Sequence, residues 1–77
     1  MRWQDRISIS AYVCHGKACI TGRRVMVSVI LASLAEGDSH ETIMANFHLA
    51  PEDIRAAMLF AADMAEDRFL PLEQEVG

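Results

Sequence analysis

The spacing of apolar residues changes from that of a strand to that of a helix near residue 26. Over residues 6–10, two isoleucines alternate with polar neighbours, which is the period of a half-buried strand. Residues 18–20 are a second short apolar run, set between Gly16 and Gly22, and they predict an extended segment that pairs with the first. Because a two-stranded ribbon alone is marginal in water, we expect it to pack on helices or on another copy.

Two helices are predicted after this ribbon. From Val27 to Leu34 apolar residues recur at i, i+3, i+4 and i+7, and Gly37 stands where a left-handed stop is expected. Ser39 is suited to cap the start of a short second helix, which we expect to end near His48. The apolar face of that helix consists of Ile43, Met44 and Phe47.

A third, longer helix is predicted to begin at Pro51, whose fixed φ suits a first helical turn. The residue before it is an alanine, which is a poor N-cap. Glu52 and Asp53 follow at once, where negative charge complements the helix dipole. We expect this helix to run to about Glu66 or Arg68.

The predicted fold is mainly α, a tri-helical helix-turn-helix-like domain with a short N-terminal extended or β segment. We expect one domain over residues 1–77, made of a basic lead-in over 1–25, a three-helix core over 26–68 and a tail over 69–77. A domain of this size buries only ~60% of the surface that its unfolded chain exposes. Because 52% of the residues are hydrophobic, we expect a second chain to cover part of the apolar surface.

The sequence shows neither a signal peptide nor a stretch suited to cross a bilayer. Its beginning is polar, and the apolar run over 25–35 is interrupted by Ser28 and Ser33. We therefore expect a cytoplasmic protein without membrane contact. In that reducing compartment, Cys14 and Cys19 are expected to be free thiols rather than a disulfide.

Charge divides the chain more sharply than its net value of −4 suggests. Residues 1–25 carry five basic residues against one acid, a local charge of +4. Residues 26–77 carry two basic residues against ten acids, a local charge of −8. The adjacent Arg23 and Arg24 are therefore the leading candidates in the chain to hold an anion.

The residues from about Arg6 to Ala62 include a series of short motifs whose order along the chain can be compared with that of known families. The key positions of this series are Gly16, Lys17, Ile20, Gly22, Arg24, Val27, Gly37, Ser39, Ile43, Leu49, Glu52, Asp53, Ile54 and Ala57. This order resembles the domain-of-unknown-function 433 family, small prokaryotic proteins described as antitoxins of the VapB type. The sequence departs from that family at Ala18 and at Ser10 or Ala11, where the family favours proline. It also departs at Arg23, where the family favours threonine.

The resemblance implies a non-enzymatic, antitoxin-like module that binds a PIN-like nuclease toxin. It also implies binding of operator DNA, by which the protein would repress its own operon. The alternative hypothesis is a protein-binding or oligomerisation domain with no DNA contact, because small three-helix arrangements serve that role as well. A PIN-like reading frame beside this one would favour the first hypothesis.

Operator binding requires cations near the phosphates, because the DNA backbone supplies most of the non-specific affinity. The third helix begins with two acids, so the cations must come mainly from the basic half. The candidate nucleic-acid-binding residues are Lys17, Arg23, Arg24, Arg6 and Arg55. Two alternatives stay open for Arg23 and Arg24: a solvated turn that pairs with acids of the second or third helix, and insertion into the carboxylate-rich metal site of a PIN-like toxin.

The third helix is apolar over most of its circumference. Only two of the twelve residues over 54–65 are charged. Such a helix must be buried on more than one side, and only two other predicted helices are available to cover it. We therefore expect Leu59, Phe60 and Met64 at a partner interface, in a homodimer or with the toxin; a wholly intramolecular core is the alternative.

We expect no catalytic, cofactor or metal site. The spacing of Cys14, His15 and Cys19 is not that of a standard zinc ligand pair, and no second close pair follows. Cys14 and His15 are adjacent, so on an extended segment they would point to opposite faces, which does not suit a thiol nucleophile and its base.

Overall fold

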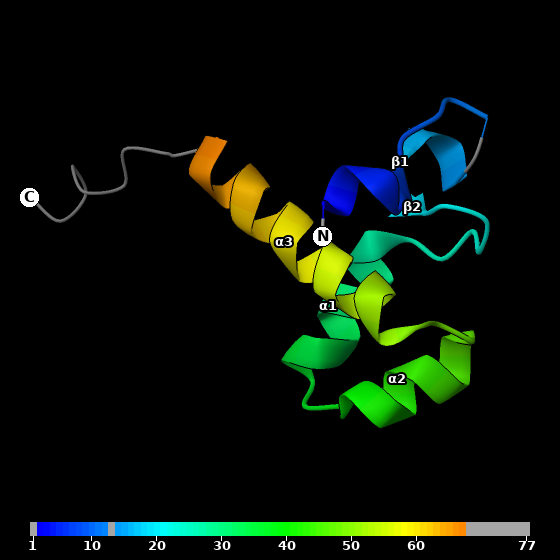
Figure 1. Cartoon of the computed structure of the whole chain (residues 1–77), viewed down its shortest axis with the longest axis vertical. Coiled ribbons are helices and arrows are strands. Elements are labelled where there is room, and N and C mark those ends of the chain that lie inside the picture. The colour runs from blue at the N-terminus through cyan, green and yellow to red at the C-terminus, as the bar shows by residue number, and fades with distance from the viewer. Residues whose placement is uncertain (1, 13, 68–77) are drawn as a thin grey trace, which may run out of the picture.

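The computed structural model describes residues 2–12 and 14–67, which form three α-helices beside a small N-terminal β-ribbon (Figure 1). The elements, in which η marks a 3-10 helix, are η1 (Trp3–Asp5), β1 (Ile7–Ser8), η2 (Cys14–Gly16), β2 (Cys19–Ile20), α1 (Val27–Ala35), α2 (His40–Phe47) and α3 (Pro51–Asp67). The fold is mainly α, as predicted. Residue 68 and the predicted tail over 69–77 lie outside the described residues.

The ribbon is shorter than the strand predicted over 6–10. β1 pairs antiparallel with β2, and Ile7 lies opposite Ile20. Because β2 offers only two residues for pairing, Ile9 lies past the end of the ladder and is 63% exposed. The alternation of apolar residues therefore predicted the position of the strand correctly and overestimated its length.

The predicted ends of α1 and α2 are confirmed. Gly37 has a φ of +96°, and the Asp38 N–H donates to the Ser33 carbonyl at 3.1 Å, which closes α1. Ser39 Oγ accepts a hydrogen bond from the Thr42 N–H at 3.1 Å and caps the start of α2.

Three residues, His48, Leu49 and Ala50, join α2 to α3. His48 takes a left-handed conformation with a φ of 57°, and the Leu49 N–H donates to the Met44 carbonyl at 3.0 Å. Leu49 itself is buried, so the turn is held to the core by a side chain as well as by its backbone. A short turn of this kind between two helices is the helix-turn-helix arrangement, and Figure 1 shows α2 lying below the start of α3.

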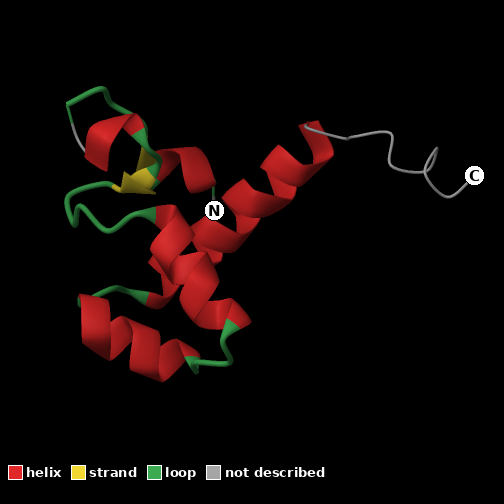
Figure 2. Ribbon diagram, turned by 180° about the vertical axis from the view of Figure 1, so that it is seen from behind, coloured by secondary structure: helices red, strands yellow, loops and turns green. Residues whose placement is uncertain are grey.

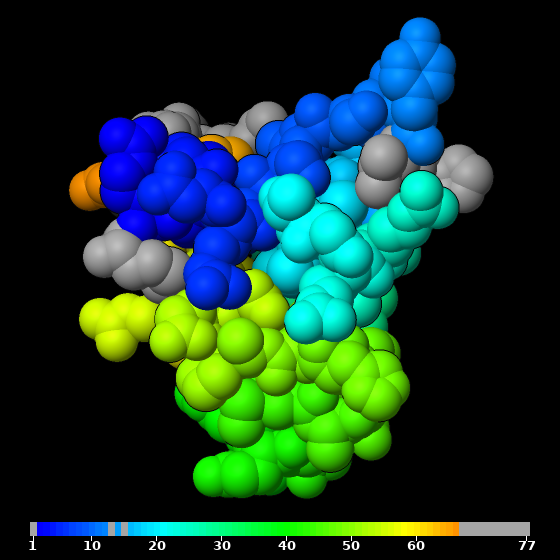
Figure 3. All heavy atoms as spheres, turned by 45° about the vertical axis from the view of Figure 1, so that its right-hand side comes forward, coloured from blue at the N-terminus to red at the C-terminus, as the bar shows by residue number. Residues whose placement is uncertain are grey.

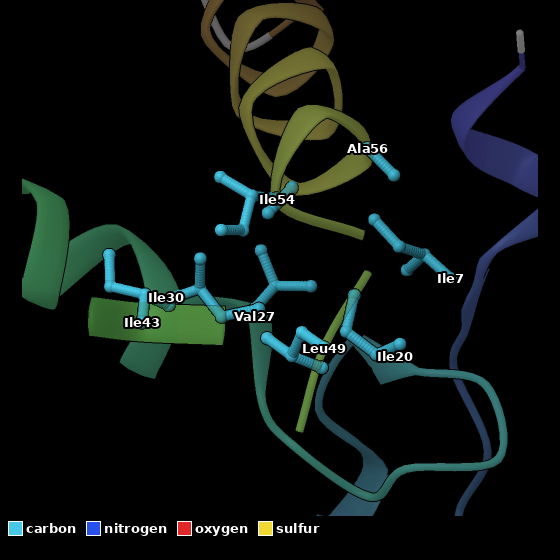
Figure 4. Packing of buried hydrophobic residues seen from close by; sticks show 9 residues of the cluster. Ile7, Ile20, Val27, Ile30, Ile43, Leu49, Ile54 and Ala56 are labelled. Atoms are coloured by element: carbon cyan, nitrogen blue, oxygen red, sulfur yellow. The ribbon is translucent and has the colours of Figure 1, made fainter. Parts of the chain in front are cut away.

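The core lies where the ribbon and all three helices meet (Figure 4). Its buried members are Ile7, Ile20, Val27, Ile30, Ile43, Leu49, Ile54, Ala56 and Ala57. Ile30, Ile43 and Ile54 come one from each helix, and each is 0% exposed. The three helices therefore depend on one another for burial of their apolar faces.

Asp53 ties the beginning of the chain to the start of α3. Its Oδ1 accepts from Arg6 Nη1 at 2.7 Å, and its Oδ2 accepts from the Ala50 N–H at 2.9 Å. The second bond satisfies a backbone donor at the helix start, as the reciprocal half of a capping box does. A buried acid in the first turn thus satisfies the backbone N–H of Ala50, whose own side chain cannot cap the helix.

The helix η1 packs against α3 (Figures 1 and 2). The Trp3 ring lies edge-on to the Phe60 ring, with centroids 5.0 Å apart and 85° between the planes. Trp3 Nε1 also donates to the Asp63 carboxylate. α3 therefore has a neighbour that the periodicity of the sequence did not predict, and Phe60 is half-buried within the chain.

Candidate functional site

Residues Arg23 and Arg24 lie in the tip of a hairpin, which we call the arginine hairpin and define as residues 18–27. The Ile20 N–H donates to the Val25 carbonyl at 2.8 Å and closes the loop. The N–H groups of both arginines donate back to the Ile20 carbonyl, at 3.1 and 3.2 Å. The tip is therefore fixed by its own backbone.

Contacts with the preceding segment hold the tip from the other side. The Thr21 N–H donates to the Arg6 carbonyl at 2.9 Å, and Thr21 Oγ1 donates to Ser8 Oγ at 3.2 Å. Cys14 Sγ donates to the Arg24 carbonyl at 3.6 Å. A loop fixed before a ligand arrives loses less conformational entropy on binding, so it presents its cations at a low cost.

Both arginine side chains are exposed. Neither forms an ion pair with α2 or α3 among residues 2–12 and 14–67. Figure 3 shows the tip, in cyan, on the surface above the green and yellow residues of α2 and the start of α3. The site therefore offers two adjacent positive charges to an external anion.

Lys17 and Arg24 border two different hollows, both of which are also lined by Met26. Lys17 lines a groove with Met26 and Phe60. Arg24 lines a second hollow with Met26 and Phe47, the last residue of α2. The structure thus brings Arg24 next to the helix-turn-helix and places Lys17 beside the middle of α3.

The two other candidate cations have different surroundings. Arg6 is bound to Asp53, and its side chain is 37% exposed. Arg55 is exposed on α3 and borders a hollow that also contains Glu52 and His40. Of the five cations predicted to bind nucleic acid, Arg23 and Arg24 share one loop, Arg6 is paired with Asp53, and Lys17 and Arg55 border two other hollows.

The three residues predicted at a partner interface are not equally accessible. Leu59 is 36% exposed, whereas Phe60 and Met64 are half-buried. Met58, which was not predicted to be part of the interface, is 39% exposed. The free apolar surface of α3 is therefore turned toward Met58 and Leu59.

Tyr12 was missed by the sequence analysis. It is 96% exposed, in the segment between β1 and η2. An aromatic side chain so open to solvent suits contact with a partner. The only signal in the sequence that could have indicated Tyr12 is weak: it is an aromatic residue that follows the alternation of apolar and polar residues over 6–10.

The structure has both cysteines as free thiols, with Cys19 buried and Cys14 half-buried. Burial raises the pKa of the Cys14 thiol, hydrogen bonding to Cys19 and its charge raise it further, and Arg24 opposes this rise. A thiol that stays protonated is a weak nucleophile and a weak metal ligand. Within the described ranges no three histidine, cysteine or acidic side chains are grouped to hold a metal ion.

Comparison with known proteins identifies a family for this chain. No curated protein and no solved structure matches the chain. Among the described helices, none combines the length and the apolar character needed to cross a membrane. A family model matches residues 7–61, which span the ribbon, the arginine hairpin, α1, α2 and much of α3. The chain therefore belongs to the family described as protein of unknown function (DUF433).

Proposed function

We propose that the protein is an antitoxin-like helix-turn-helix module that binds operator DNA as a repressor and binds and inhibits a PIN-like nuclease toxin. The observation that carries this proposal is the arginine hairpin, whose two exposed arginines stand on a fixed loop beside the end of α2. Both partners offer anionic sites that suit guanidinium groups: phosphates on DNA, and metal-binding carboxylates in the nuclease.

The start of α3 does not suit a phosphate contact, so the proposed DNA contact is centred on the hairpin rather than on this helix. Glu52 is exposed there and would face phosphates. Asp53 is buried and already bound to Arg6, so that arginine is engaged inside the protein. In this proposal α3 is mainly architectural, and the cations of the tip supply the affinity.

Replacement of both Arg23 and Arg24 by alanine is expected to weaken binding to the protein's own promoter for all DNA sequences alike. Each lost phosphate contact lowers the slope of log K against log salt by about 0.9, so the double variant should lose up to about 1.8. The measurement is a titration of promoter and unrelated DNA at two or more salt concentrations, with and without the toxin.

Arg55→Ala is the comparison variant for the other candidate site, because Arg55 is also exposed but lies beside Glu52. We expect a smaller loss of DNA affinity from this change, unless Arg55 reads a guanine, in which case discrimination at one base pair falls by about 1–3 kcal/mol. The repressor role is refuted if the wild-type protein fails to bind DNA at low salt both alone and with the toxin.

Charge reversal of Arg23 and Arg24 to glutamate is expected to restore the nuclease activity of an inhibited toxin. The physical reason is repulsion between the new carboxylates and those that bind the metal of a PIN-like site. The measurement is RNA cleavage by the product of a neighbouring PIN-like reading frame, mixed with each variant. Unchanged inhibition, together with loss of inhibition on neutralising Glu66, Asp67, Glu73 and Glu75, would show instead that the acidic half contacts the toxin.

A second candidate function is a protein-binding or oligomerisation domain that never meets DNA. The exposed Glu52 at the start of α3 favours it, because a carboxylate at that place repels phosphate. The exposed Met58 and Leu59 favour it as well. The DNA titration described above separates the two functions.

A further inference from the structure

The solvent side of α3 carries a row of residues with an apolar centre and a charge at each end. We call this row the α3 seam; it consists of Arg55, Leu59, Ala62 and Glu66. Its members are separated by four, three and four positions, so they lie in one line along the helix. All four are exposed, and neither charged member has an ion-pair partner in the described part of the chain.

The other side of α3 is occupied by the protein's own core. Asp53, Ala57 and Ile54 are buried there, and Phe60 packs against Trp3. Figures 1 and 2 show that the later turns of α3 run out from the body of the molecule. Another helix can therefore reach the α3 seam without disturbing the fold.

We propose that the α3 seam binds the α3 seam of a second copy, with the two helices antiparallel. Alternating separations of four and three are the spacing with which two helices interlock in a coiled coil. A two-fold axis between residues 60 and 61 places Leu59 of each copy against Ala62 of the other. The small alanine gives the larger leucine room, and the exposed Met58 widens the apolar contact.

The charges select the antiparallel orientation. With that same axis, Arg55 of each copy faces Glu66 of the other, so an ion pair forms at both ends of the contact. A parallel pair would instead place arginine against arginine and glutamate against glutamate. Charges at the edge of an interface set its orientation more than its affinity. The charges of the seam are thus complementary in an antiparallel pair of helices and repel each other in a parallel pair.

This interface differs from the one predicted from the sequence. Leu59 is common to both, whereas Phe60 packs against Trp3 and Met64 is half-buried. The dimer also engages Arg55, which leaves the arginine hairpin as the main source of free cations for another partner. The dimer does not depend on DNA or toxin binding, so the proposed dimer and the proposed function can each fail without the other.

Sedimentation equilibrium of the full chain tests the dimer over a range from about 1 to about 500 μM. Because the seam is short, we expect a dissociation constant in the micromolar range. Leu59→Glu should weaken the dimer by about tenfold or more, because it places a charge in the apolar centre. Arg55→Glu and Glu66→Arg should each weaken it as well, because each creates like-charge contacts at both ends.

The double variant Arg55→Glu with Glu66→Arg separates the two orientations. In an antiparallel dimer it restores opposite charges at both ends, so the dissociation constant should return to near the wild-type value. In a parallel dimer the double variant leaves like charges facing each other, so the dissociation constant should not return to the wild-type value. Glu41→Arg is the control for charge reversal at an exposed residue of α2, which is not a member of the seam, and it should leave the dimer unchanged.

Circular dichroism of each variant shows whether the fold is retained, which we expect because all the substituted residues are exposed. Three results would overturn the proposal: a monomeric wild type at the highest concentration, a dimer insensitive to Leu59→Glu, or a double variant no better than the single ones. A monomeric wild type that still binds its promoter would remove this dimer and leave the proposed function standing.

Discussion

Ile54→Ala is expected to remove a large part of the protein's free energy of unfolding. Ile54 lies at the start of α3, is 0% exposed and belongs to the core that α1 and α2 also enter. Truncation of a fully buried isoleucine costs about 3–4 kcal/mol, because it removes apolar contacts and leaves a cavity. A domain of this size has a total stability of only about 4–12 kcal/mol, so the loss consumes a large part of it.

The measurement is urea denaturation followed by circular dichroism, at a protein concentration at which the wild type is monomeric. Ile54→Val removes one methylene group and should cost about 0.5–1.5 kcal/mol. Met58→Ala, one turn later on the exposed side, should cost less than about 1 kcal/mol. Equal losses for Ile54→Ala and Met58→Ala would contradict the assignment of Ile54 to the core.

Asp53→Ala is expected to destabilise the protein by about 2–3 kcal/mol. The change removes the acceptor of the Ala50 N–H and leaves the Arg6 guanidinium without its partner. Arg6 is partly exposed and water can solvate it, so the cost is smaller than for a fully buried pair. The measurement is again the free energy of unfolding, obtained from urea titrations.

Glu52→Ala is the matched control, since it removes an acid from the same helical turn at an exposed position. Its effect should lie within about 0.5 kcal/mol of zero. Asp53→Asn keeps an acceptor for the Ala50 N–H but loses the charge that faces Arg6, so its cost should fall between the other two. If Asp53→Ala is no more harmful than Glu52→Ala, the pairing of Asp53 with Arg6 and Ala50 contributes nothing measurable.

The spacing of apolar residues and the capping residues were sufficient to predict the three helices from the sequence. Ser39 caps α2 and Gly37 closes α1 as predicted, because capping depends on the side chain and backbone of one or two residues. The strand near Ile7 was also located by its alternation, since that pattern reflects burial of one face. Its length was overestimated, because the number of paired residues depends on a partner segment that lies elsewhere in the chain.

Only part of the candidate site could be predicted from local sequence patterns. The sequence identified Arg23 and Arg24 by the crowding of charge, and the structure adds that they share a tip held by the carbonyl of Ile20. It also named Arg6 as a candidate nucleic-acid contact, and the structure adds that the Arg6 guanidinium is bound to Asp53. That pair joins residues far apart in the chain, and no local pattern specifies such a contact.

Tertiary structure alone decided which side of α3 is free. Because α3 is apolar over most of its circumference, its sequence is compatible with several buried faces. Packing of Trp3 on Phe60 selects one of them and leaves Leu59 in solvent. The helices were thus predictable from the sequence, because they depend on interactions between residues that are close in the chain. The exposed surface was not predictable in this way, because burial depends on how distant segments of the fold cover one another.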